Sequence, residues 1–476
     1  MSRLSIPLLT LLVLTGCQKY RADPLEPAEV FRTLEAKRQP PVANETPGAN
    51  VAPALNKPFT LKRAAEALRT TGPDVQETLA EYRTALAVAQ VDTPLPNPGL
   101  EIGPQFGFGP DLGPVNEVAP FGSIGFTIPL GKRLRRQTEL NRALADVARV
   151  HAMARFRELY LELRARYAEL AIGRQRLATR RDIAASAEKT LDTGRQLVQA
   201  GQANAMDIAL FELEHQRSLA AALAVEREVV RTEGELSRML GIRFENFRDL
   251  PEPALPSMPE TAPALDELRE RLIRNHTGLA RLRAQYEAAE RALRMEISRQ
   301  FPDLQIGPNW ENDVGERRTT VGLTLGLEIP LFDRNRQGIA EARKKREEIR
   351  VKYEAEARRA LAGLEKAYRD LDVSRRNAAL LRGKIVPLAR KNVDLARRTM
   401  QAGPVDALRL LEAERSEREM RIEALAADLE EYAAWIALEQ AVGCPLVAFP
   451  SEPNADGPAL PEGLDEDAGE EGAGKN

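Results

Sequence analysis

Two stretches of the sequence alternate between apolar and small or polar residues. The apolar positions of one stretch are Val321, Leu323, Leu325, Leu327, Ile329 and Leu331; those of the other, about 200 residues earlier, are Ile124, Phe126, Ile128 and Leu130. Successive side chains of a strand point to opposite faces, so each stretch predicts a strand with one apolar face. Each predicted strand leads directly into a long, charged segment with helical periodicity.

Another alternating segment precedes each of these strands. Residues 97–108, with Leu100, Ile102, Phe106 and Phe108, are followed by a Gly- and Pro-rich loop over 109–122 and by the strand at 123–130. This order is typical of a β-hairpin with a long loop. Residues 301–308 stand in the same place before the later strand.

The helical segments are unusually long. Residues 132–200 contain no proline, and a run of ~69 residues at ~1.5 Å per residue makes a helix on the order of 100 Å. Part of its apolar pattern is spaced by 4, 3, 4 and 3 residues, at Phe156, Tyr160, Leu163, Tyr167 and Leu170. Such spacing favours lengthwise packing on other helices. A second helix is expected over 205–240, and helices over 61–92 and 264–300 are expected before the strands.

The order of elements occurs twice. Gln401-Ala402-Gly403 follows Gln199-Ala200-Gly201 by 202 residues, and Gly443 follows Gly241 by the same interval. We interpret this as an internal duplication, with one copy over 60–244, a Pro-rich linker over 245–263 and a second copy over 264–443. Pro387 interrupts the long helix expected over 335–400 and predicts a kink or break there.

The N-terminus is typical of a targeting segment. Arg3 precedes the apolar run 4–14, and Leu14-Thr15-Gly16-Cys17 resembles a lipoprotein processing site. We therefore expect a signal peptide over 1–16 and lipidation of Cys17; an ordinary signal peptide is the alternative. Residues 17–59 are expected to form an extended leader, and the acidic tail 444–476 to be disordered.

Composition narrows the class of protein. Charged residues make up 29% of the chain and aromatic residues 5%, which favours long helices over compact globules. The formal net charge of −3 gives no electrostatic case for nucleic acid. The chain contains two cysteines; with Cys17 modified, Cys444 has no disulfide partner and is expected to be a buried structural thiol.

Strands of about ten residues are long enough to cross a bilayer when tilted. Alternating faces fit a membrane barrel, with one face toward lipid and the other toward a lumen. Four strands cannot close a barrel, because the smallest membrane barrels have about eight and open edges are not tolerated in lipid. In a membrane, the barrel must therefore be shared among copies, and three copies would supply twelve strands. Two small soluble sheets capping a coiled coil are the alternative.

Several of these residues also carry a family resemblance. The chain resembles the TolC-type outer membrane efflux proteins across essentially all of its mature sequence. The narrower likeness is to the cobalt-zinc-cadmium efflux outer-membrane components, on Asn97-Pro98, Gly131-Lys132-Arg133, Pro330-Leu331-Phe332-Asp333-Arg334-Asn335 and Gly338-Ile339-Ala340-Glu341-Ala342. Asp333 or Asn335 is also suited to cap a helix, which would make this motif a structural junction.

The resemblance implies a mainly α protein with a small membrane β part. It implies a homotrimer with a 12-stranded β-barrel on an α-helical barrel, located in the outer membrane and projecting into the periplasm. The implied partners are outer membrane lipid, a periplasmic adaptor and an inner-membrane pump, expected to be proton-driven. The implied function is passive conduction to the exterior, with divalent heavy-metal cations as a candidate cargo.

The resemblance also assigns candidate site residues. Gly201 and Gly403 match the turns at the periplasmic tip, where the adaptor docks. Acidic residues narrow the channel near the second tip in the family, and the matching positions here are Arg409 and Glu412. Arg409 departs from the acidic pattern, and its counterpart in the first copy is Asp207. We expect either an Arg409–Asp207 pair that latches the closed state or two solvated helix residues.

No catalytic constellation, cofactor motif or metal site is recognisable. The histidines His151, His215 and His276 are far apart and lack the spacing of a metal site. We therefore expect no enzyme. Two readings other than an efflux channel remain: a periplasmic adaptor-type coiled-coil lipoprotein, and a type I secretion channel for proteins. Two complete copies of strands and helices favour a channel over an adaptor, whereas the sequence does not separate efflux from secretion.

Overall fold

The computed structural model describes residues 20–38, 60–106, 118–199, 205–243, 258–259, 261–313, 318–402 and 407–446. The chain divides into two units, residues 1–56 and residues 57–476. The first contains helix α2 (Pro27–Arg38), where the sequence predicts only an extended leader. The predicted signal peptide, Cys17 and most of the predicted acidic tail lie outside the described residues.

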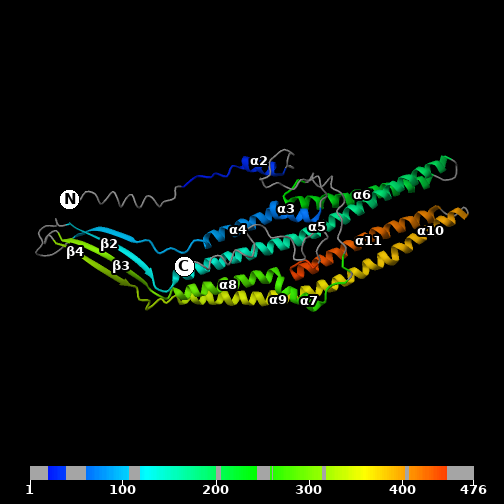
Figure 1. The fold of residues 1–476 in the computed structure, drawn as a ribbon. Helices are drawn as coiled ribbons and strands as arrows, with labels where there is room; N and C mark the ends of the chain where they lie inside the picture. The colour runs from blue at the N-terminus through cyan, green and yellow to red at the C-terminus, as the bar shows by residue number, and fades with distance from the viewer. Residues whose placement is uncertain are drawn as a thin grey trace. The chain divides into compact units, whose positions relative to one another are not determined.

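The second unit contains the duplicated elements (Figure 1). The first copy consists of α3 (Leu61–Thr71), α4 (Pro73–Ala89), β1 (Gly99–Phe106), β2 (Val118–Pro129), α5 (Arg133–Gln199) and α6 (Ala205–Leu240). The second copy consists of α7 (Leu265–Asn275), α8 (Thr277–Ser298), β3 (Asp303–Asp313), β4 (Arg318–Leu327), α9 (Arg336–Leu380), η2 (Leu381–Ile385), α10 (Val386–Ala402) and α11 (Ala407–Val442). The expected mainly helical fold with four strands is confirmed.

The four strands form one antiparallel sheet in the order β1-β2-β3-β4. The β2–β3 pairing joins the two copies, with Phe126 opposite Ile306. Two expected strand limits were wrong. Strand β2 begins at Val118 instead of residue 123, inside the expected loop. Strand β4 ends at Leu327 instead of Leu331; β3 begins at Asp303, so it offers no partner to the residues after 328.

The predicted helical spacing marks the core of the first copy. Phe156, Tyr160, Leu163, Tyr167 and Leu170 are each 3% exposed or less and pack with residues of α3, α4 and α6. The second copy has a smaller core centred on α7, α9 and α11, which includes Leu364, Leu371 and Trp435. Leu361 of α9, three residues before Leu364, is 40% exposed and does not belong to this core.

The predicted interruption near Pro387 is confirmed as a π-helical turn. Five residues, Leu381–Ile385, separate α9 from α10, and the N–H of Val386 bonds to the carbonyl of Leu381, five positions back. Proline has no N–H, and its ring clashes with the carbonyl four residues earlier, so a regular helix is disfavoured there. A π turn just before the proline lets the helix continue.

The helix expected over 264–300 is two helices, because His276 interrupts it. His276 has extended backbone angles and forms the N-cap of α8, with its Nδ1 accepting the N–H of Leu279 at 3.3 Å. The corresponding break in the first copy falls at Gly72, just before Pro73. The break at His276 was not predicted, because neither proline nor glycine stands at this position.

Candidate channel wall and helical hairpins

One face of the sheet is continuously apolar. On this face, Ile124, Phe126 and Ile128 of β2 each lie opposite an apolar residue of a neighbouring strand. For example, Phe126 faces Ile306, and Ile306 faces Leu325. The other members of this face include Leu100, Ile102, Ile124, Ile128, Leu304, Val321, Leu323 and Leu327. Most are well exposed, for example Val321 at 74% and Ile102 at 66%. The predicted alternation therefore produces a two-faced sheet whose apolar side is uncovered in the isolated chain.

The opposite face is mostly polar or small. Glu101 lies beside Ser123, which lies beside Asn309, and the hydroxyl of Ser123 donates to the Glu101 carboxylate at 3.5 Å. Glu311 projects from the same face, two residues further along β3. These carboxylates make the polar face suited to contact water and cations.

Two aromatic side chains cover glycines across neighbouring strands. A Cβ built at Gly122 would overlap the ring of Trp310, and one built at Gly103 would come within 2.8 Å of Phe121. Each aromatic ring therefore occupies the space that a side chain would take on the next strand. Such pairs fix the register of strands that are rich in glycine. This explains why residues 118–122 belong to the sheet despite their loop-like composition.

The sheet has two open edges. Strand β1 pairs only with β2, and strand β4 pairs only with β3, among the described residues. The edges therefore present unpaired backbone groups along strands of eight and ten residues. In lipid such groups must be paired. An apolar face combined with two open edges is the arrangement that another copy of the chain would complete.

Polar contacts fix the sheet to the helices. The Asn335 side chain donates to the Glu296 carbonyl at 2.9 Å and to its carboxylate at 2.7 Å, while Asp333 accepts the N–H of Asn335 at 2.8 Å. Arg133, at the start of α5, pairs with Asp303 at the start of β3 at 2.9 Å. The motif around Asn335 is therefore a structural junction between strand and helix.

A buried ion pair joins the two copies. Arg164 of α5 and Glu439 of α11 lie 3.0 Å apart, with side-chain exposures of 2% and 0%. The same Glu439 oxygen accepts the Trp435 indole N–H at 3.0 Å and the Leu446 N–H at 2.9 Å. Burial lowers the pKa of Arg164, against the opposing effect of Glu439. No local sequence pattern predicts this pair, because its members are 275 positions apart.

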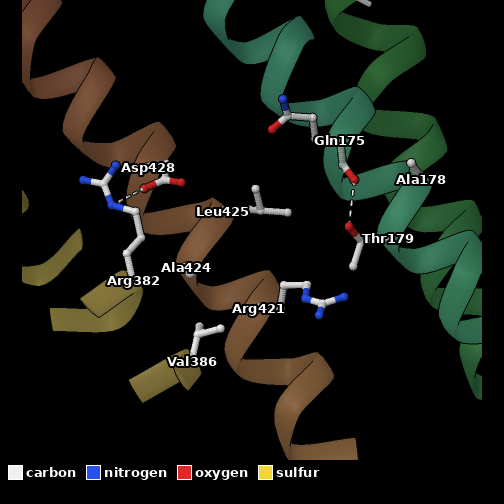
Figure 2. Close-up of a pocket in the computed structure, with 9 residues that line it drawn as sticks. All are labelled: Gln175, Ala178, Thr179, Arg382, Val386, Arg421, Ala424, Leu425 and Asp428. Carbon is white, nitrogen blue, oxygen red and sulfur yellow. Dashed lines mark hydrogen bonds and ion pairs between the residues drawn. The ribbon is translucent and has the colours of Figure 1, made fainter. Parts of the chain in front are cut away.

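A cavity of about 460 Å³ lies beside the π turn, between α5 of the helical hairpin α5–α6 and α11 of the helical hairpin α10–α11. Figure 2 shows Leu425 of α11 projecting toward Gln175 and Thr179 of α5. Arg382 pairs with Asp428 at 3.3 Å and with Glu431 at 2.7 Å. Burial raises the pKa of Asp428, whereas Arg382 acts to lower it. The cavity leaves room between α5 and α11 along this part of the hairpins.

The predicted tip residues are only partly described. Gly201 and Gly403 lie outside the described residues, in the segments that connect α5 with α6 and α10 with α11 in the sequence. Asp207 lies in α6, but its side chain is outside the described residues as well. Arg409 and Glu412 lie in the first two turns of α11 and are exposed. The Arg409–Asp207 latch therefore stays a prediction.

Among the described residues, no group of three His, Cys, Asp or Glu side chains could hold a metal ion. No helix in the same residues is long and apolar enough to cross a membrane. Cys444 is half-buried beside the second core instead of fully buried.

The fold defined by this sheet and these hairpins is that of outer-membrane channels. The structure of the outer-membrane channel OprN superposes with a TM-score of 0.68 at 19% identity, covering 80% of this chain and 89% of that one. The structure of CusC, described for its transmembrane channel formation, gives 0.64 at 15% identity, covering 80% and 92%. At these identities the likeness concerns the fold.

The sequence comparisons point to the same class. Residues 268–444 match the family described as outer membrane efflux protein, which confirms the family resemblance. The cobalt-zinc-cadmium resistance protein CzcC of Cupriavidus metallidurans is 28% identical over 190 residues, covering 40% of this chain. The chain matches 44% of the length of that relative, less than half of it. The family matched by residues 268–444 is one of outer membrane efflux proteins, and the matched solved structures are outer-membrane channels.

Proposed function

We propose that the protein is the outer-membrane channel of a tripartite efflux system. It forms a passive conduit that receives substrate from a periplasmic adaptor and an inner-membrane pump and opens to the exterior. The observation that carries this proposal is the sheet with a continuous apolar face and two open edges. Contact with lipid stabilises the apolar face, but unpaired backbone groups at the strand edges are not tolerated in lipid, so copies must join edge to edge.

Three copies would give twelve strands, above the minimum of about eight for a membrane barrel. The polar face would then line the lumen, and the apolar face would contact lipid. Lipidation of Cys17 would add an anchor, which on its own gives only partial membrane binding. The trimeric assembly and the signal peptide are both parts of this proposal.

The hairpins α5–α6 and α10–α11 support a periplasmic tip. We place the adaptor at the turns that contain Gly201 and Gly403. The gap between α5 and α11 would let one hairpin move relative to the other when the tip opens. The Arg409→Ala variant tests the latch: its closed-state conductance should be higher than that of the native channel. An unchanged closed-state conductance would contradict the latch.

The proposed cargo is divalent heavy-metal cations. This proposal rests on the similarity to a relative whose name refers to cobalt, zinc and cadmium resistance. Selectivity is assigned to the pump, because the described residues hold no metal cluster. Growth of a strain lacking the gene should fall in cobalt, zinc or cadmium and recover with the full chain; unchanged tolerance to all three would redirect the proposal to drugs or secreted proteins.

Conductance of the full chain in a planar bilayer tests the channel. The expected result is discrete single-channel steps from protein of trimeric mass. Steps that are absent, together with release from the membrane when Cys17 is replaced by serine, would favour the adaptor-type lipoprotein instead.

A further inference from the structure

A basic pocket lies where the apolar face of the sheet meets the helices. Its cavity measures about 370 Å³ and is lined by Leu130, Gly131, Lys132, Arg136, Arg294, Ile297, Ser298 and Phe301. Three of these eight residues are cationic and none is acidic. The lining comes from both copies, because α5 follows β2 and α8 precedes β3.

The pocket continues the apolar face. Leu130 lies two residues beyond Ile128 in the alternation, and these side chains are 50% and 42% exposed. Phe301 and Ile297, at 57% and 40%, add apolar surface from the α8 side. Gly131 permits the close approach of α8, since a Cβ there would meet the Ser298 carbonyl and the Phe301 ring.

The cations of the pocket are not equally engaged. Arg136 is held by Glu139 at 2.7 Å, whereas Arg294 lies 3.6 Å from Glu290. Lys132 is exposed and forms no ion pair within the described part of the chain. The pocket therefore keeps positive charge beside exposed apolar side chains.

At the corresponding junction of the second copy, the residue equivalent to Lys132 is uncharged. Asn335 stands 203 positions after Lys132 and has the same left-handed backbone, with φ of 53° against 55°. Its neighbours are Asp333 and Glu296, which it contacts directly. Arg334 and Arg336 flank Asn335, but the position equivalent to Lys132 is neutral and contacts two carboxylates, so the second junction lacks the cation that Lys132 supplies at the first.

We propose that this pocket binds the headgroup of an anionic phospholipid from the periplasmic leaflet. The phosphate lies among Lys132, Arg136 and Arg294, and the acyl chains run along Leu130 and Ile128. Cations next to a membrane surface attract anionic lipid, and an apolar wall beside them retains the chains. The inference rests on the proposed function, because it requires the sheet to stand in the membrane.

The test is native mass spectrometry of the full-length, delipidated protein with added palmitoyl-oleoyl phosphatidylglycerol. Each cation is expected to contribute about fivefold to lipid retention, from about 1 kcal/mol per basic residue near a membrane surface. Lys132→Gln and Arg294→Gln should each show that loss. Lys132 forms no ion pair with the described residues, so the K132Q protein is expected to fold normally, which circular dichroism verifies.

Arg135 supplies a matched control. It lies next to Arg136 and also pairs with Glu139, at 3.1 Å, but it does not line the pocket. Arg136→Gln should lower retention, and Arg135→Gln should leave it unchanged. Equal losses from both variants would overturn the pocket.

Two ligand controls separate headgroup from chains. Diacylglycerol with the same acyl chains should be retained poorly, and glycerol 3-phosphate should not be retained. Equal retention of diacylglycerol would reduce the site to an apolar groove, and equal retention of glycerol 3-phosphate would make it a free phosphate site; either result overturns the proposal. Conductance measured on the same variants keeps this outcome distinct, since a conducting channel without lipid retention would refute only the pocket.

Discussion

The two copies within the chain have the same fold but differ in what holds them together. Gly241 and Gly443, 202 positions apart, follow equivalent helices with φ of +67° and +87°. A Cβ at Gly241 would meet the Thr71 carbonyl, and one at Gly443 the Asn275 carbonyl, each at the end of the equivalent helix α3 or α7. The positions where the backbone leaves no choice are thus shared.

The copies differ at positions where the backbone conformation allows more than one type of side chain. The first copy has one uninterrupted long helix, whereas the second contains the π turn before Pro387. The first junction has a lysine that forms no ion pair with the described residues, and the second has an asparagine bonded to Glu296. Glu439 has no acidic counterpart in the first copy, since the position 202 residues earlier holds Ser237. Duplication therefore supplied the frame, and divergence supplied the contacts that join the copies.

Breaking the buried ion pair should have the largest effect. Glu439→Ala leaves the Arg164 guanidinium buried without its carboxylate, so we expect a loss of about 3–5 kcal/mol in the free energy of unfolding. Urea titration of the purified protein, followed by circular dichroism, measures it. The double variant R164M/E439M should recover part of the loss, because no uncompensated charge remains, although the Trp435 and Leu446 N–H groups lose their acceptor; a double variant as unstable as E439A would show that charge does not govern the site.

Alanine at the shared glycines tests whether the copies obey the same backbone rule. Gly241→Ala and Gly443→Ala should each cost about 3 kcal/mol or more, since positive φ in a non-glycine residue costs about 1–3 kcal/mol and the Cβ also clashes. Gly363→Ala is the control: no heavy atom lies within 4 Å of its Cβ position, and a helical Gly→Ala change stabilises by up to about 1 kcal/mol. Thermal unfolding of the three variants decides, and a tolerated substitution at either shared position would break the comparison.

The helix breaks differ in pH dependence. Burial lowers the pKa of His276; the carboxylates of Glu356 and Glu158 act to raise it, and Arg281 acts to lower it further. A lowered histidine pKa means that the unfolded chain binds the proton more readily, so this contribution is full above the ordinary pKa of about 6.5 and is lost as the pH falls toward the folded value. His276→Asn keeps an N-cap but cannot titrate. Between pH 7.5 and 5 its melting temperature should therefore fall less than that of the native chain; parallel curves would contradict the assignment.

The smallest expected effect concerns the lumen. Glu101 on the first hairpin and Glu311 on the second project from the polar face of the sheet. Neutralising both, as E101Q/E311Q, should lower the cation-to-anion permeability ratio by a modest factor while leaving channel formation intact. Reversal potentials in a salt gradient measure this. An unchanged ratio would mean that the polar face does not line the conducting path.

The sequence predicted the features with local periodicity. Alternation placed the faces of the sheet, and the 4, 3 spacing from Phe156 to Leu170 marked the buried stripe of α5. It missed the start of β2, because Pro120 and Gly122 read as a loop until Trp310 is seen to cover that glycine. It also missed His276 and the Arg164–Glu439 pair, since their partners are set by packing between distant segments. Of the candidate site, the tip residues remain predictions.

Cross-linking between the open edges of the sheet tests the central claim most directly. With Cys444 replaced by serine, one cysteine is placed in β1 at Glu101 and one in β4 at Thr324 or Gly326, all on the polar face; a Cβ at Gly326 meets no atom closer than ordinary contact. A disulfide forms only when the Cα atoms approach within about 7 Å, so oxidation in native membranes reports edge pairing. The account predicts covalent trimers for at least one combination and only monomers for each single cysteine. Monomers from every combination, in protein that is membrane-embedded, would contradict a barrel closed by edge pairing between copies.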